Sequence, residues 1–103
     1  MYEIGLITTP NEGEAKKIAN ELVKDRLIAC ANIISGIKSI YIWKGKIEED
    51  QECLMIIKTK TDMQEKIINK IKQIHSYETP ECIFLSINSG LKDYLKWIDK
   101  NVE

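Results

Sequence analysis

Apolar and polar residues follow two different periods along the first quarter of this chain. Between Glu3 and Thr8 apolar residues alternate loosely with polar ones, a pattern that predicts a short strand. The next apolar residues recur three and four positions apart, which predicts a helix with one buried face, at Ala15, Ile18, Ala19, Leu22 and Val23. Thr9 and Pro10 precede this pattern, and we expect Thr9 to cap the helix with Pro10 in its first position.

The middle of the chain has the composition of two long strands joined by a tight turn. Residues 29–42 and 47–59 are rich in apolar residues that favour strands, and the four residues between them include the glycine that a turn needs, Gly45. Both arms exceed the usual strand length of about 5–6 residues. A two-stranded ribbon is only marginally stable alone, so we expect the far end of this hairpin to pack on a partner chain.

The last third of the chain returns to helical spacing, then gives one more strand and a final helix. The apolar positions of the first of these helices are Met63, Ile67, Ile68, Ile71 and Ile74. A strand follows at residues 83–87, and a helix from Leu91 to Val102. The order βαββαβ plus a helix predicts an α+β fold of the ferredoxin-like kind, a single domain over residues 1–103 with two helices on one face of a four-stranded antiparallel sheet.

One strand of this predicted sheet is apolar on both faces. Its residues are Leu54, Met55, Ile56 and Ile57, and a strand of this kind cannot leave one side in water. We therefore expect the sheet face away from the two helices to be covered by the final helix and by a neighbouring subunit.

Composition and charge exclude several classes of protein. Hydrophobic residues make up 44% of the chain and charged residues 30%, as in folded proteins. Fifteen basic against sixteen acidic residues leave a net charge of −1, so we expect no nucleic-acid partner. No apolar run approaches the roughly 20 residues of a membrane helix, and no basic segment followed by an apolar one opens the chain. We therefore expect a cytoplasmic protein with no membrane partner.

The cysteines and the single histidine do not form a recognisable catalytic or zinc motif. Cys30, Cys53 and Cys82 are widely separated with no CxxC pair, which argues against a zinc knuckle and a thioredoxin-type redox site. No serine or cysteine lies at a recognisable nucleophile turn with a histidine partner. The sequence therefore predicts a protein that is not an enzyme.

The segment from His75 to Glu81 concentrates polar chemistry on a helix-to-strand connection. It holds the only histidine, a tyrosine, and two carboxylates, and imidazole with thiolate ligands suits copper or zinc. On the metal hypothesis His75 supplies a nitrogen and Glu78 or Glu81 a carboxylate. Cys30 would add a thiolate, and several chains would have to contribute because each has one histidine. Alternatively, His75 interacts only with the last carbonyls and the dipole of its helix.

Two aromatic residues alternate on one arm of the hairpin. Tyr41 and Trp43 can pack against a neighbouring subunit, where such residues are favoured. Alternatively, the two rings could stack on RNA bases. However, this sequence lacks the basic-glycine-aromatic signature of RNA-binding domains.

An ordered set of motifs extends over nearly the whole chain. The matching segments are Thr8-Thr9-Pro10 with Glu14-Ala15, Arg26 to Ile33, Ser39 to Glu48, Ile57-Lys58-Thr59, His75 to Glu81, and Tyr94 to Trp97. In this order and spacing they resemble the CutA family, the divalent-cation tolerance proteins. The resemblance implies a ferredoxin-like subunit in a tight homotrimer whose long hairpins cross between chains, and a role in tolerance of metal ions rather than in catalysis.

Three positions depart from the pattern of that family. Ser76 replaces the proline that usually follows the motif histidine, which predicts a less rigid loop. Ile7 and Ile74 stand where some relatives have a thiol and a histidine that were proposed as copper ligands. The resemblance therefore implies that copper or zinc binds weakly, if at all, near Cys30 or the His75–Glu81 loop.

A second reading also follows from the resemblance. Trimeric PII signalling proteins have a related architecture and bind ligands in clefts between subunits. On this reading the chain is a small-ligand sensor or a protein-interaction scaffold whose clefts receive a small anion or a partner. The expected cleft residues are Tyr77, Lys58, Trp43 and Tyr41. A trimer that serves only as a structural hub is the third reading.

Overall fold

Four strands form one antiparallel sheet in the spatial order β2-β3-β1-β4. The computed structural model describes all residues from Met1 to Glu103. Its elements are β1 (Tyr2–Thr9), α1 (Glu12–Lys24), β2 (Cys30–Trp43), β3 (Lys46–Lys60), a 3₁₀ turn (Thr61–Met63), α2 (Gln64–Ile74), β4 (Cys82–Ser86) and α3 (Lys92–Asn101). The expected βαββαβ order with a final helix, and the ferredoxin-like α+β fold, are confirmed.

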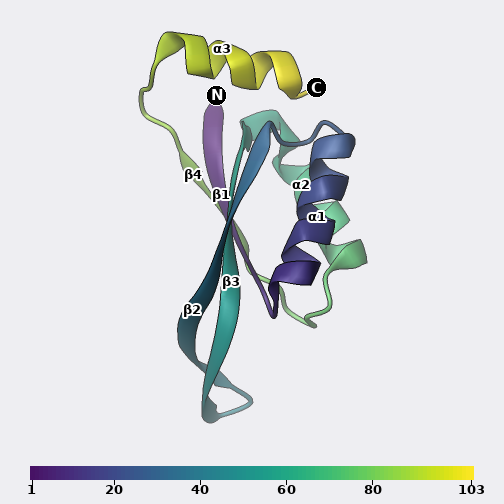
Figure 1. The fold of residues 1–103 in the computed structure, drawn as a ribbon, viewed down its shortest axis with the longest axis vertical. Coiled ribbons are helices and arrows are strands. Elements are labelled where there is room, and N and C mark those ends of the chain that lie inside the picture. The colour runs from purple at the N-terminus through teal and green to yellow at the C-terminus, as the bar shows by residue number, and fades with distance from the viewer.

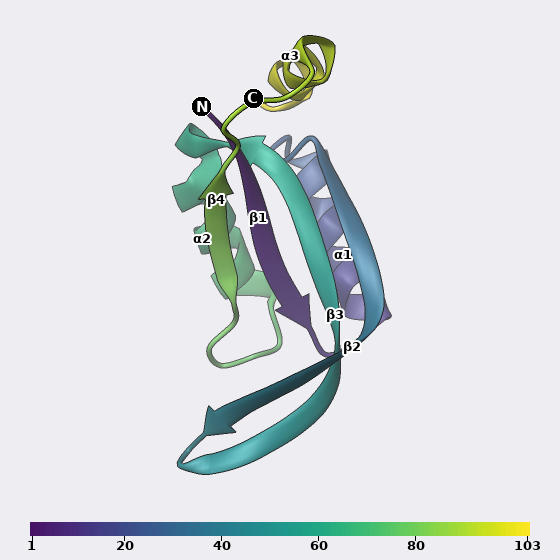
Figure 2. The same ribbon diagram turned by 90° about the vertical axis from the view of Figure 1, so that its left-hand side faces the viewer.

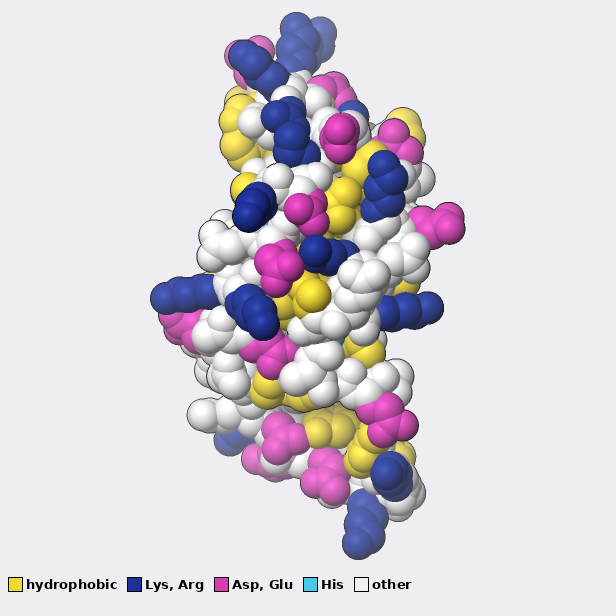
Figure 3. Space-filling view, turned by 90° about the vertical axis from the view of Figure 1, so that its right-hand side faces the viewer, with side chains coloured by type: hydrophobic (Ala, Val, Ile, Leu, Met, Phe, Trp, Pro, Cys, Tyr) yellow, Lys and Arg dark blue, Asp and Glu magenta, His cyan; other side chains and the backbone are white.

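Helices α1 and α2 lie side by side on one face of the sheet, and α3 lies across the end at which β1 begins (Figures 1 and 2). Alternate residues of β1 and β3 point towards α1 and α2, and Ile7, Met55 and Ile57 are fully buried there. Ile98 of α3 and Val102, which follows the helix, complete the same core. On the helix-covered side basic and acidic side chains are interspersed (Figure 3). None of the helices is both long and apolar enough to span a bilayer.

The opposite face of the sheet is largely uncovered in one chain, as Figure 2 shows. Leu6 of β1 pairs with Ile56 on one side and Ile83 on the other, so all three side chains share this face. Ile83 and Leu85 are each 51% exposed. We call this surface the open sheet face, and its apolar residues are Ile4, Leu6, Ile34, Leu54, Ile56, Ile83 and Leu85. The expected cover by the final helix is limited to one end of the sheet.

The hairpin of β2 and β3 extends well beyond the rest of the sheet. Strand β1 pairs with β3 only from Cys53 onwards, so the hairpin beyond that point is a two-stranded ribbon. Its tip is a two-residue turn in which Lys44 and Gly45 have φ of 52° and 80°, the conformation that type I′ hairpins require. A bulge interrupts β2 between Ile34 and Ile37. The hairpin curves away from the sheet in this region (Figure 2).

The start of α1 differs from the sequence-based expectation. The N-cap is Asn11, whose Oδ1 accepts a hydrogen bond of 2.8 Å from the Glu14 N–H. Thr9 is instead the last residue of β1, fully buried and paired with Cys53, and its hydroxyl donates to the Asn11 carbonyl. The prediction of Thr9 as cap and Pro10 as first helical residue was wrong because sheet pairing continues through Thr9 and the helix begins at Glu12. Asn caps at least as well as Thr.

Candidate functional site

His75 joins the connection between α2 and β4 to the end of strand β1. Its side chain has no exposed area. The ring Nε2 lies 2.8 Å from the Thr8 carbonyl oxygen, and Nδ1 accepts a hydrogen bond of 3.0 Å from the Tyr77 N–H. In this network Nε2 donates to Thr8 and Nδ1 accepts from Tyr77, and Nδ1 also lies 3.4 Å from Glu14 Oε2. Both ring nitrogens are therefore engaged, and the imidazole bonds to β1 rather than to the last carbonyls of its own helix.

Ser76 continues the attachment of this connection by bonding to the first turn of α1. Its N–H donates to Glu14 Oε2 at 2.9 Å, and its hydroxyl donates to Glu14 Oε1 at 2.7 Å. A proline at this position could make neither bond. Two hydrogen bonds to the Glu14 carboxylate thus offset the loss of the rigid proline ring. The expectation of a less rigid loop did not include these bonds.

Tyr77 lies against His75 and reaches across to the hairpin. The two ring centroids are 4.9 Å apart, and the Tyr77 hydroxyl donates to Glu52 Oε2 at 2.5 Å. Burial of the ring raises the pKa of Tyr77 well above its usual range, and the bond to Glu52 raises it further. The connection is therefore fixed at three points, to β1, to α1 and to β3.

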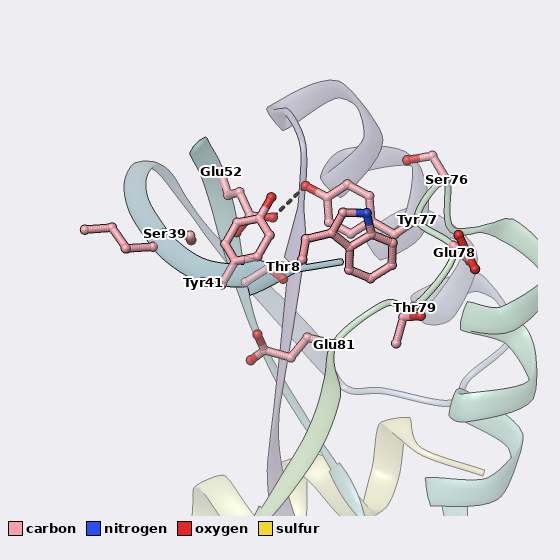
Figure 4. Close-up of a pocket in the computed structure, with 11 residues that line it drawn as sticks. Thr8, Ser39, Tyr41, Glu52, Ser76, Tyr77, Glu78, Thr79 and Glu81 are labelled. Atoms are coloured by element: carbon pink, nitrogen blue, oxygen red, sulfur yellow. Dashed lines mark hydrogen bonds between the residues drawn. The ribbon is translucent and has the colours of Figure 1, made fainter. Parts of the chain in front are cut away.

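A pocket of about 650 Å³ opens between the hairpin and this connection (Figure 4). The hairpin contributes one wall and the residues after His75 the other. Figure 4 shows Tyr41 and Tyr77 on either side of Glu52, with the Tyr77 hydroxyl bonded to its carboxylate. The lining contains three glutamates, three aromatic rings and no basic side chain: Thr8, Ser39, Ile40, Tyr41, Trp43, Glu52, Ser76, Tyr77, Glu78, Thr79 and Glu81.

The residues predicted for the cleft and the metal site separate into two groups. The members that line the pocket are Tyr41, Trp43, Tyr77, Glu78 and Glu81. Cys30 and Lys58 face each other across β2 and β3, outside the pocket lining. The Cys30 thiol lies 3.7 Å from the Tyr94 hydroxyl, and Lys58 donates to Asn32.

Within one chain, no three or more histidine, cysteine or acidic side chains converge in a group that could hold a metal ion. His75 can ligate a metal only by giving up its bond to Thr8 or to Tyr77. The metal assignment of His75, Cys30, Glu78 and Glu81 thus stays a prediction, and it requires contributions from more than one chain.

Two important residues of this region were not singled out from the sequence. Glu52 ends a polar run in which nothing distinguishes it from its exposed neighbours, and only the pairing of the hairpin turns it towards Tyr77. Glu14 lies in the first turn of a helix, where acidic residues are common without further function. Its position among the family motifs was the only signal available.

Tyr41, on the hairpin side of the pocket, has a raised pKa that can be measured. Its hydroxyl donates to Asp50, and this bond, with burial and nearby carboxylates, raises the pKa of Tyr41 to about 12. The neutral phenol is favoured in the folded state, so its contribution to stability is complete below about pH 10 and is lost as the pH rises to about 12. In a titration of absorbance at 295 nm, Tyr41→Phe should remove an ionisation near pH 12. Asp50→Asn should move this ionisation to lower pH. An unchanged titration curve for Asp50→Asn would show that the bond to Asp50 does not raise the pKa of Tyr41.

Comparison with known proteins gives consistent matches over the whole fold. Residues 4–101 match the model of the family described as CutA1 divalent ion tolerance protein. The divalent-cation tolerance protein CutA of Thermus thermophilus is 45% identical over 101 residues, which are 98% of each chain. Protein CutA of Homo sapiens is 45% identical over 97 residues, 94% of this chain but 54% of the human one. The solved structure described as the periplasmic divalent cation tolerance protein CutA of Archaeoglobus fulgidus is 42% identical, covers each chain completely and superposes with a TM-score of 0.97.

Proposed function

The chain belongs to the CutA1 divalent ion tolerance protein family, and from this membership we propose that it takes part in the cellular response to divalent metal ions. The observation that carries the proposal is the match of residues 4–101 to the family model. The family is described by ion tolerance and not by a reaction, so we further propose that the protein is not an enzyme. Its three cysteines are unpaired, as in proteins of reducing compartments, which supports assignment to the cytoplasm.

We propose that the protein acts as a homotrimer. The open sheet face supports this, because apolar residues such as Ile83 and Leu85 remain half exposed in one chain. The projecting ribbon supports it as well. Ile40, Ile42 and Ile47 near its tip are 67–78% exposed, and a ribbon of two strands gains stability by packing on another surface.

In the trimer we propose that Cu²⁺ or Zn²⁺ binds weakly, with ligands from more than one chain. The candidates remain Cys30, His75, Glu78 and Glu81. Cys30 is only partly buried, so a metal can reach its thiol. The thiol of Cys82 is a poor candidate, because burial, with the nearby Glu81, raises its pKa to about 11 and keeps it protonated.

The test is a titration of chelator-treated protein with Cu²⁺ and with Zn²⁺, followed by native mass spectrometry. We expect up to three metal ions per assembly, with binding weakened by Cys30→Ser and unchanged in the matched control Cys82→Ser. Substitution of His75 is a poorer test, since it also removes the bond to Thr8 that fixes the connection. Uptake of metal that is equal in both cysteine variants would contradict the assignment of Cys30. Absence of stoichiometric uptake would contradict direct metal binding.

A further inference from the structure

The pocket between the hairpin and the His75–Glu81 segment is rich in hydrogen-bond acceptors and carries negative charge. Three of its lining residues are glutamates, Glu52, Glu78 and Glu81, and none is lysine or arginine. The tyrosines do not change this balance, since Tyr41 donates its hydroxyl hydrogen to Asp50 and Tyr77 donates its own to Glu52. The pocket therefore favours a ligand that carries positive charge and several N–H donors. The small anion expected for this cleft has the wrong charge.

Glu52 presents a carboxylate oxygen that a ligand in the pocket can reach. The residue is only 9% exposed, and its carboxylate receives one hydrogen bond from a protein side chain, on Oε2 from Tyr77. Oε1 bonds to no protein donor and remains accessible to solvent, and no basic group pairs with the carboxylate. A cation in the pocket can therefore pair with Glu52 through Oε1.

The aromatic residues and the size of the pocket indicate what kind of cation fits. Tyr41, Trp43 and Tyr77 supply ring faces, which attract ammonium groups and cover apolar carbon atoms. Trp43 already shows this behaviour within the chain, because the Nζ of Lys44 lies 5.8 Å from its ring centroid. A volume of about 650 Å³ lies in the range of small-molecule sites, roughly 300–1,000 Å³. A bare metal ion would leave most of this space unfilled.

We propose that this pocket binds a small organic cation with a primary ammonium group. The ammonium group donates to Glu52 Oε1, and the apolar part of the ligand lies against Tyr41 and Trp43. Glu81, an exposed residue of the pocket lining, adds attraction for the positive charge. This binding goes beyond the proposed role in metal tolerance and needs neither Cys30 nor a metal ion.

Isothermal titration calorimetry of the metal-free full-length chain tests the proposal, with benzylamine and 1,4-diaminobutane as probes. Benzyl alcohol and benzoate are the matched neutral and anionic controls. We expect saturable binding of at least one amine, at least 10-fold tighter than either control, and weaker binding as salt is added because the attraction is electrostatic. No binding of either amine at concentrations up to about 10 mM would overturn the proposal, since this corresponds to a negligible affinity. Equal affinity for benzylamine and benzyl alcohol would also overturn it.

Variants locate the ammonium group and separate this proposal from metal binding. Glu52→Gln retains an oxygen that can accept from Tyr77 but removes the charge, and it should weaken amine binding at least 10-fold. The control Glu65→Gln changes an exposed carboxylate on α2 and should have no effect. If Glu52→Gln does not fold, Glu81→Gln and Trp43→Leu, both at less buried positions, should each weaken binding several-fold. Unchanged amine affinity in a folded Glu52→Gln variant would refute the binding of the ammonium group at Glu52. Unchanged affinity in both Glu81→Gln and Trp43→Leu would refute binding in this pocket. Cys30→Ser should leave amine binding intact whatever it does to metal uptake.

Discussion

Gly5→Ala is expected to destabilise the protein by about 2 kcal/mol, because a side chain at this position would overlap a packed core residue. A Cβ atom on Gly5 would lie 2.6 Å from Ile57 Cγ1 and 2.8 Å from Ile57 Cδ1. Ile57 has no exposed surface and lies directly opposite Gly5 in the β1–β3 pair. Its branched side chain has few rotamers to choose from, so it cannot move aside at low cost. The Phe84 ring, 3.3 Å from the same point, closes the other side.

The same contact predicts strong coupling between the two positions. Ile57→Ala alone should cost about 2–5 kcal/mol, because it removes buried carbon atoms and leaves a cavity. In the double variant the new methyl group at Gly5 occupies space that Ile57 has vacated. The double variant should thus be more stable than the sum of the single effects predicts, by about 1 kcal/mol or more.

Urea unfolding at one fixed protein concentration measures this cycle, since assembly makes stability depend on concentration. Gly13→Ala is the matched control, because the nearest atom to its Cβ is 3.5 Å away. Alanine in a helix is favoured over glycine by about 0.5–1 kcal/mol, so this control should stabilise the protein. If the losses in free energy of unfolding caused by Gly5→Ala and Ile57→Ala simply add, Ile57 is not the residue that clashes with the new methyl group.

Leu85→Asp is expected to convert the proposed trimer into monomers. Leu85 belongs to the open sheet face, opposite Ile4 in the β1–β4 pair, and is 51% exposed in one chain. If neighbouring subunits cover this face, the new carboxylate would be buried without a partner at each of three equivalent places. A buried unpaired charge costs roughly 3–5 kcal/mol, and symmetry multiplies that cost across the assembly.

Size-exclusion chromatography with light scattering at micromolar concentration reads the outcome directly. The unchanged protein should have about three times the 11.9 kDa mass of one chain, and Leu85→Asp should fall to that of one chain. Lys17→Asp, an exposed substitution on α1, is the control and should leave the assembly unchanged. A mass of 11.9 kDa for the unchanged protein would contradict the trimer. An intact Leu85→Asp trimer would show that the interface lies elsewhere.

The secondary structure could be predicted well because each element has its own local signal. The helical spacing from Ala15 to Leu22 and the glycine at position 45 in the hairpin turn depend on neighbours in the sequence alone, and the structure confirms both the helix and the turn. Local signals failed at Thr9, where pairing with Cys53 of a distant strand extends β1 past the expected cap.

The candidate site could be predicted only in part, for a related reason. Tyr77, Glu78 and Glu81 share one connection, so their proximity follows from the sequence. The proximity of Tyr77 to Glu52 depends on the register of the long hairpin, which alternation does not specify once a bulge intervenes. Cys30 was grouped with His75 on the evidence of shared motifs, yet it lies beside Lys58 and Tyr94, outside the pocket.

The bulge in β2 sets the bend of the outer ribbon, whereas pairing with β3 sets the side on which each of its side chains lies. Two residues there, Ser35 and Gly36, face the single residue Cys53, and beyond this point Tyr41 pairs with Glu48 on the same side as Glu52. Because Ile37 already pairs with Glu52, loss of one of the two residues would remove the bulge and leave Tyr41 opposite Glu48. The ribbon would then bend less, and its aromatic wall would move relative to the His75–Glu81 segment. A single codon deletion could thus change the width of the pocket without replacing any side chain that lines it, a short evolutionary route between relatives with ligands of different size.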